Sequence, residues 1–141
     1  MDVAGGRERS RTGLMLAPLG AGAAVAAAVT CLAVVDPNQP GHYPVCPLYF
    51  LTGLYCPGCG ALRAVHDLAV GDLHGALGMN PLLVVAVPFA AYWWGRWALR
   101  SWQGRPGRMI VARPAPLWAV LVVVLAFGVV RNIPFGRFLA P

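Results

Sequence analysis

The sequence has no lysine and little charge of either sign. Eleven arginines and five acidic residues make up only 11% of its 141 positions, whereas a soluble domain carries about 25% charged residues. A chain so poor in charge cannot cover a water-facing surface, so the composition predicts an integral membrane protein, and the long apolar segments described below predict that it is all-α. The net charge of +6 does not predict nucleic-acid binding, because the arginines flank apolar segments and form no basic stripe on a soluble fold.

Charge is absent altogether from residues 12–35. About 20 apolar residues are enough to cross the hydrocarbon core of a bilayer. The apolar region of a cleaved signal peptide spans only about 7 to 15 residues and ends at an Ala-x-Ala site, and no such site directly precedes Asp36. We therefore expect residues 12–35 to form an uncleaved first transmembrane helix.

Two further apolar segments, residues 81–99 and 115–130, predict a second and a third transmembrane helix. Asn80 can cap the second helix, and Pro81 suits its first position. The far end of this helix carries aromatic residues that are typical of a membrane interface: Tyr92, Trp93, Trp94 and Trp97. The third segment is short, and we expect Arg131 to extend from its end to the lipid headgroups.

The arginines also indicate an orientation in the membrane. Three precede the first span, five accompany the loop between the second and third spans, and only Arg63 lies between the first two. By the positive-inside rule, the basic N-terminus (1–11) and the basic loop (100–114) are cytoplasmic. The segment 36–80 and the tail 131–141 are then extracytoplasmic, although two arginines in the tail oppose this. We expect a multi-pass protein of the cell membrane.

The extracytoplasmic segment begins with a turn-rich stretch and contains a Cys-Pro-Gly-Cys turn. The apolar residues after this turn predict a helix that ends at Gly71, and Asp72 can cap a further short turn through Gly78. We expect this element to lie in the membrane interface or to enter the membrane as a re-entrant helix. Irregular backbone at membrane depth is tolerated only where protein covers it or where it lines a wet cavity.

Three cysteines share this segment, Cys46, Cys56 and Cys59, and His42 lies four residues before the first. A second Cys-x-x-Cys pair and the βαβ context of thioredoxin-like proteins are both missing. In a thiol–disulfide protein, Cys56 at a helix start would be the attacking thiol and Cys59 the resolving thiol. In a zinc site, the three thiolates and His42 would form a tetrahedral shell, and His66 or His74 could replace His42. A structural disulfide among the three cysteines is the interpretation that we favour.

One arginine lies in the apolar helix that follows the cysteines. Arg63 needs a partner in such surroundings, and we expect either Asp67, one helical turn later, or a lipid headgroup phosphate to supply it. The alternative is that Arg63 binds a ligand in a cavity.

The same residues carry a resemblance to a known family. Its core is Cys56-Pro57-Gly58-Cys59-Gly60 with Arg63-Ala64, followed by Gly71-Asp72, Ala76 and Asn80-Pro81; further landmarks are Asp36-Pro37-Asn38, Cys46-Pro47, Gly53-Leu54 and Arg131-Asn132-Ile133-Pro134. In this pattern, over roughly residues 34–135, the chain resembles domain of unknown function 2752. Members commonly carry a hydroxyl residue directly before the arginine, where this chain has Leu62. The resemblance implies a small multi-span membrane protein of bacteria and supplies no activity.

We therefore expect a structural or accessory membrane component whose CPGC loop is held by a disulfide, rather than an enzyme. The alternatives are a thiol–disulfide protein that uses Cys56 and Cys59, and a zinc-binding membrane protein that uses Cys46, Cys56, Cys59 and His42. The expected partners are the lipid bilayer and either another membrane protein or a second copy of the chain, with no nucleic acid.

Overall fold

The computed structural model describes residues 11–39, 41–105 and 115–141, which form helices and no strands. The long helices are α1 (Arg11–Val34), α5 (Pro81–Trp102) and α6 (Ala115–Val130). The short elements are α2 (Pro47–Thr52), α3 (Ala61–Ala69), α4 (Leu73–Met79) and the 3₁₀ helix η2 (Pro134–Leu139). The all-α prediction is confirmed for this part of the chain. Most of the predicted basic N-terminus and basic loop lies outside the described residues.

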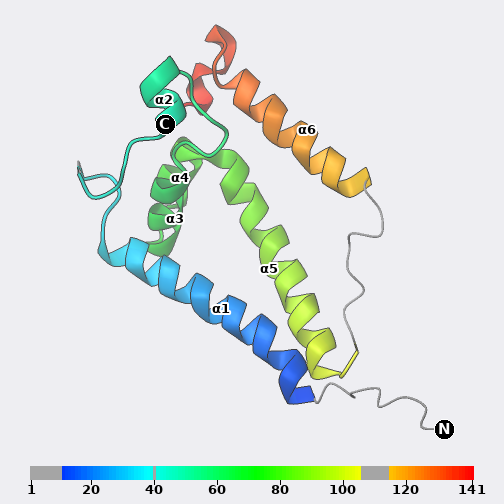
Figure 1. The fold of residues 1–141 in the computed structure, drawn as a ribbon. Coiled ribbons are helices and arrows are strands. Elements are labelled where there is room, and N and C mark those ends of the chain that lie inside the picture. The colour runs from blue at the N-terminus through cyan, green and yellow to red at the C-terminus, as the bar shows by residue number, and fades with distance from the viewer. Residues whose placement is uncertain (1–10, 40, 106–114) are drawn as a thin grey trace, which may run out of the picture.

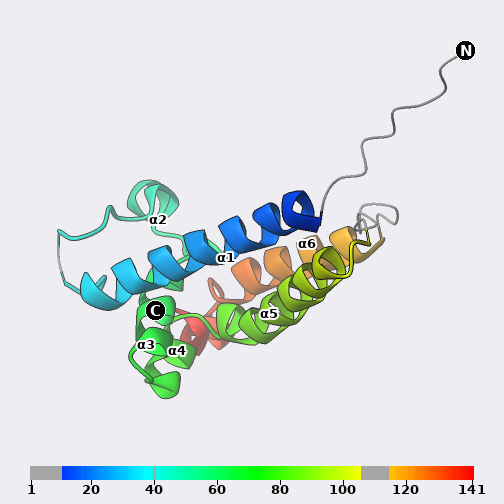
Figure 2. The ribbon, with the colours of Figure 1, turned by 90° about the horizontal axis from the view of Figure 1, so that it is seen from below.

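The short elements gather at one end of the three long helices. Figure 1 shows the C-terminal ends of α1 and α6 and the N-terminal end of α5 on that side, with α2, α3, α4 and η2 beside them. Figure 2 shows the same grouping from below. Residues 36–80 and the C-terminal tail therefore share one end of the molecule, as an assignment to the same side of a membrane requires.

The helices α1 and α5 are long and apolar enough to cross a membrane. Only 11% of the apolar window of α1 and 0% of that of α5 is buried within the chain, so neither is the covered core helix of a soluble domain. Their length and composition suggest a membrane location. The helix α6 has 16 residues, or roughly 24 Å at 1.5 Å per residue, and is shorter than a typical span.

One tryptophan joins α1 to α5. The indole Nε1 of Trp94 donates a hydrogen bond to the main-chain oxygen of Pro18, 3.0 Å away. The same ring fills the space beside Gly22, where a Cβ atom would come within 2.7 Å of it. The sequence predicts an interfacial position for Trp94, and the structure adds this helix–helix contact.

The helices α3 and α4 form a hairpin between the diverging ends of α1 and α5 (Figure 1). Asp72 caps α4 by accepting a hydrogen bond from the Gly75 amide at 2.8 Å. Asn80 caps α5 by accepting one from the Leu83 amide at 3.0 Å. Both predicted caps are confirmed, and they fix where the chain turns from the hairpin into the long helix.

The chain after α6 differs from the prediction. Arg131 is only 1% exposed, so the expectation that it extends to the lipid headgroups is wrong. After Val130 the backbone turns into η2, which packs on both α6 and α4. This turn directs Arg131 back into the protein. The sequence analysis also did not predict α2 or η2.

We predict that Gly22→Leu weakens the contact between α1 and α5. The new side chain must displace the Trp94 ring and its hydrogen bond to Pro18, and overpacking of this kind costs about 1–3 kcal/mol. Thermal unfolding in detergent would measure the loss. Gly20→Leu is the matched control, because a side chain there meets nothing within 4 Å and changes helix propensity equally. Equal melting temperatures for the two variants would contradict the prediction.

Candidate metal centre

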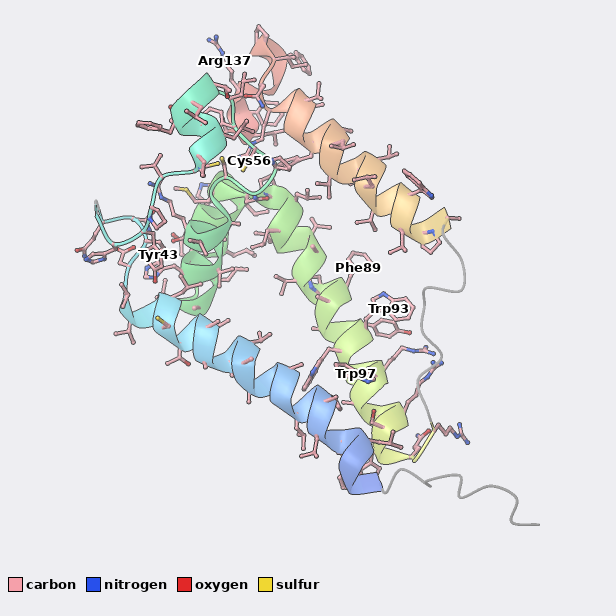
Figure 3. The ribbon with its side chains drawn as sticks, in the orientation of Figure 1. Tyr43, Cys56, Phe89, Trp93, Trp97 and Arg137 are labelled. Atoms are coloured by element: carbon pink, nitrogen blue, oxygen red, sulfur yellow. The ribbon has the colours of Figure 1, made fainter. Side chains whose placement is uncertain are left out.

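Three cysteine sulfurs converge in the cap formed by the short elements. The Sγ atoms of Cys46, Cys56 and Cys59 all lie within 4.8 Å of one another. Cys56 Sγ is 3.1 Å from Cys59 Sγ and 3.5 Å from Cys46 Sγ. Cys59 is buried, whereas Cys46 and Cys56 are half-buried. Figure 3 shows Cys56 in the loop that follows α2, close to the end of α6. The structure thus brings the sulfur of Cys46 close to those of the Cys-x-x-Cys pair that begins ten residues later at Cys56.

Local backbone geometry positions each sulfur. Cys46 is the residue before α2, whose first position is Pro47. The turn at Cys56 is closed by a hydrogen bond from the Cys59 amide to the Cys56 oxygen at 3.1 Å. The Cys56 amide in turn donates to Cys59 Sγ at 3.2 Å. A main-chain donor aimed at sulfur stabilises a thiolate, so the turn favours a charged Cys59 once its proton is lost.

Gly60 allows the turn to pass directly into α3. Its φ is +78°, in the left-handed region that favours glycine. A Cβ atom at this position would also come within 2.5 Å of the Met79 main-chain oxygen. The glycine after the second cysteine is therefore required both by the backbone conformation and by the close approach of the end of α4.

Two buried side chains hold the carbonyl groups of the CPGC turn. Asn80 Nδ2 donates to the oxygens of Pro57 and Cys59, at 3.1 and 3.2 Å. Arg131 Nη1 donates to the oxygens of Cys56 and Cys59, at 3.0 and 3.1 Å. Asn80 is 2% and Arg131 1% exposed. The turn therefore depends on one residue before α5 and one after α6.

Asn132 holds the residue that precedes the turn. Its side chain accepts a hydrogen bond from the Tyr55 amide at 2.8 Å and donates to the Tyr55 oxygen at 2.8 Å. Its Nδ2 is also 2.7 Å from the Gly128 oxygen at the end of α6. These pairs fix the loop at the end of α6 independently of any bond between sulfurs.

The environment separates the acidities of the thiols. The Tyr49 amide, and then the neighbouring thiols of Cys56 and Cys59, lower the pKa of Cys46 to about 7. Burial, and then the hydrogen bonds that the Cys59 thiol donates to Cys56 and Cys46, raise the pKa of Cys59 to about 12. In the thiol–disulfide alternative, the sequence analysis made Cys56, at a helix start, the attacking thiol. The structure lowers the pKa of Cys46 instead, because the amides of the first turn of α2 face its sulfur.

Burial lowers the pKa of Arg131, whereas negative charge on Cys59, Cys56 and Tyr55 raises it. An arginine stays protonated in proteins even so. Its guanidinium carbon lies 4.9 Å from the Phe127 ring centre and 5.8 Å from that of Tyr55. A permanent positive charge is thus enclosed beside the backbone of Cys56 and Cys59.

The other predicted site residues lie elsewhere. His42 is not part of the sulfur cluster, and its Nδ1 lies 2.8 Å from the Asp36 main-chain oxygen. Arg63 is exposed and Asp67 is buried, and no ion pair joins them in the described part of the chain. The predicted pair is wrong because Asp67 is buried against α4, where its Oδ2 lies 3.3 Å from the position of a Cβ atom at Gly75, whereas Arg63 stays in the exposed part of α3. Asn80 was predicted only as a helix cap, and its second role at the turn is new.

No disulfide joins the cysteines of the described residues, all four of which are free thiols. The predicted disulfide-held loop is therefore not what this structure contains. Side chains of Asn80, Arg131 and Asn132 hold the loop in its place. Cys31, which the sequence analysis did not assign to the site, lies apart on α1 and is exposed.

An open cavity of about 450 Å³ lies beside the loop. Its polar lining residues include Tyr55, Arg131, Asn132 and Arg137, and none of the cysteines lines it. The cavity therefore lies on the arginine side of the turn and is not a route to the sulfurs.

Comparison with known proteins confirms the family resemblance. Residues 46–94 match the family described as a protein of unknown function, DUF2752. The match covers 49 of the 141 residues (46 to 94 inclusive), so it includes the three loop cysteines and Asn80 but not Arg131. No curated protein and no solved structure matches the chain.

We predict that Cys46 is the most reactive thiol of the reduced, metal-free protein. The thiolate is the reacting form, so a pKa of about 7 makes alkylation of Cys46 rise to half its maximum near pH 7, with Cys59 reacting last. Peptide mapping by mass spectrometry after timed alkylation would rank the cysteines, in a Cys31→Ser background. Faster modification of Cys56 than of Cys46 at neutral pH would contradict this order.

Proposed function

We propose that this DUF2752 protein is a multi-span membrane protein that binds one divalent metal ion, best fitted by zinc, through Cys46, Cys56 and Cys59. The observation that carries the proposal is the convergence of three sulfurs from two separate segments. A Cys-x-x-Cys turn alone serves redox, metal and structural roles alike. A third cysteine brought to the same point favours metal.

The sulfur spacing supports a shared ion. Zinc–sulfur bonds of about 2.3 Å in a tetrahedral shell place sulfurs roughly 3.8 Å apart. The observed separations of 3.1 and 3.5 Å, and the overall limit of 4.8 Å, bracket that value. Small rotations of the cysteine side chains therefore bring all three onto one ion, and thiolate ligands suit zinc better than magnesium or calcium.

Three protein ligands leave a fourth position for a water molecule, another small ligand or a side chain of a partner. His42 was the predicted fourth ligand, and it is bonded to the Asp36 backbone instead. The half-buried Cys46 and Cys56 form the more accessible side of the cluster. An open fourth position is a feature of catalytic and exchangeable zinc sites, whereas structural sites have four protein ligands.

A structural disulfide and a redox pair explain less of the geometry. Either would use two of the sulfurs and leave the third, which belongs to a different segment, without a reason to be there. The buried hydrogen bonds of Asn80, Arg131 and Asn132 already hold the loop. The lowered pKa of Cys46 favours a redox role only if Cys46 attacks a disulfide between the other two, and the thiol analysis below detects that state.

We also propose that the chain crosses the membrane three times, with α1, α5 and α6, and that the cysteine cap is extracytoplasmic. The distribution of arginines supports this orientation, and so does the position of the cap and the C-terminal tail at one end of the helices. The helix α6 has 16 residues, and it can cross the membrane where the bilayer thins locally to match its length.

Lipid, and either another membrane protein or a second copy of the chain, are the proposed partners. Within this chain α6 buries none of its residues and packs chiefly on η2. Phe89 and Trp93 point from α5 toward the side of α6 (Figure 3) and remain at least half exposed. Such apolar surface requires acyl chains or protein to cover it.

We predict about one zinc ion per chain in protein purified without chelator. Cys46→Ser, Cys56→Ser and Cys59→Ser should each lose most of this zinc, because each substitution removes one of the three ligands of the same ion. Elemental analysis and intact-mass thiol trapping would measure metal and free thiols on the same sample. Cys31→Ser is the matched control and should retain its zinc. Two loop cysteines oxidised in every preparation, with no bound metal, would contradict the proposal.

We predict that an impermeant thiol reagent labels the loop cysteines of intact cells after chelation and mild reduction, because the proposed orientation puts them outside. A Cys31→Ser background restricts the signal to the loop, and mass spectrometry after extraction would identify the labelled residues. Labelling that appears only after lysis would place the cap in the cytoplasm and would invert the proposed orientation.

A further inference from the structure

The most unusual group outside the sulfur cluster is the Arg131 guanidinium. It is enclosed by protein, with 1% of the residue exposed. All three of its hydrogen-bond acceptors are main-chain oxygens, those of Cys56, Cys59 and Leu139. Its Nε is buried without a hydrogen-bond partner among the described residues. These contacts supply dipoles but no negative charge.

No carboxylate compensates this charge in the described part of the chain. The one ion pair found there joins His66 to Asp36, and the buried Asp67 is not paired with Arg131. The rings of Phe127 and Tyr55 compensate part of the charge by cation–π contact. An enclosed charge without a counter-charge is unfavourable, so a negative group nearby would stabilise this part of the fold.

The cysteine cluster is the group in position to carry that negative charge. Arg131 is bonded to the backbone oxygens of both Cys56 and Cys59, so its charge lies next to two of the three cysteines. Three neutral thiols carry no charge, and a Cys46 thiolate alone places its charge on the one cysteine of the cluster whose backbone Arg131 does not bind. Three thiolates on a divalent ion carry a total of −1, which balances one arginine.

Resting on the proposed metal-binding function, we propose that Arg131 is the charge-compensating and positioning residue of the centre. Its single positive charge favours a centre that carries a net charge of −1. Such a centre consists of a divalent cation, three thiolates and a neutral fourth ligand, such as water or an imidazole. An anionic fourth ligand would leave the buried site with an uncompensated negative charge. A monovalent ion on three thiolates would do the same. Arg131 touches no sulfur among the contacts described, and it acts through the charge and the backbone of the ligands.

The test compares zinc affinity, by competition with a chromophoric chelator, in the full-length protein in detergent. Arg131→Gln removes the charge and keeps a hydrogen-bond donor, and it should weaken zinc binding about 10- to 100-fold, as loss of an outer-shell partner does. Arg131→Lys keeps the charge and should recover most of that loss. Arg137→Gln is the matched control, because Arg137 is an exposed arginine of the same tail, and it should bind zinc as the wild type does.

The zinc-induced rise in melting temperature separates this role from a purely structural one. Loss of backbone hydrogen bonds alone lowers the melting temperature equally with and without zinc and leaves the rise unchanged, whereas loss of charge compensation reduces the rise. Should Arg131→Gln fail to fold, Arg131→Met, which keeps the contacts with Phe127 and Tyr55, takes its place.

The outcomes also separate this inference from the function on which it rests. If the wild type binds zinc tightly and Arg131→Gln or Arg131→Met binds it with the same affinity, the charge role is overturned and the metal centre stands. Equal weakening by Arg131→Lys and Arg131→Gln overturns it too, since the charge would then not matter. A wild-type protein that binds no zinc under reducing conditions overturns both.

Discussion

The enclosed guanidinium of Arg131 connects the parts of the chain that make up the cysteine cap. One of its nitrogens binds the carbonyls of Cys56 and Cys59, and another binds the carbonyl of Leu139 in η2. The CPGC turn, the end of α6 and the C-terminal segment therefore share one buried cation. Because the residue is only 1% exposed, the protein around it supplies the hydrogen-bond acceptors, and a counter-charge nearby would stabilise it further. These contacts tie the fold of the cap to the chemistry of the cysteines.

Two asparagine side chains also hydrogen-bond to the cysteine loop and hold it from other sides. Asn80 uses its oxygen to start α5 and its nitrogen to hold the CPGC turn. Asn132 accepts a hydrogen bond from the Tyr55 amide and donates one to the Tyr55 oxygen. A loop held by side-chain amides and a guanidinium keeps its shape while its thiols stay free to bind metal. A cross-linked loop would have consumed those thiols.

Some of this organisation was predictable from local patterns. The low charge and the apolar segments predicted helices, and the Asn80-Pro81 and Asp72 signals located helix starts that the structure confirms. These features depend on residues within one turn of each other. The pairing of Arg63 with Asp67 followed the same local rule and is wrong, because burial in the hairpin, and not spacing along α3, decides where each side chain points. The helices α2 and η2 are too short to leave a periodic pattern.

The sequence by itself determined the chemical type of the molecule: a helical, apolar chain with a cysteine-bearing segment between its first two long helices. It also identified Cys46, Cys56 and Cys59 as the residues that carry chemistry, since residue type and spacing are local properties. Only the tertiary structure decided that the three sulfurs meet, that His42 stays away, and that Arg131 turns inward onto the backbone of Cys56 and Cys59. The position of Arg131 depends on contacts with residues 75 and 72 positions away, which no local sequence pattern reveals.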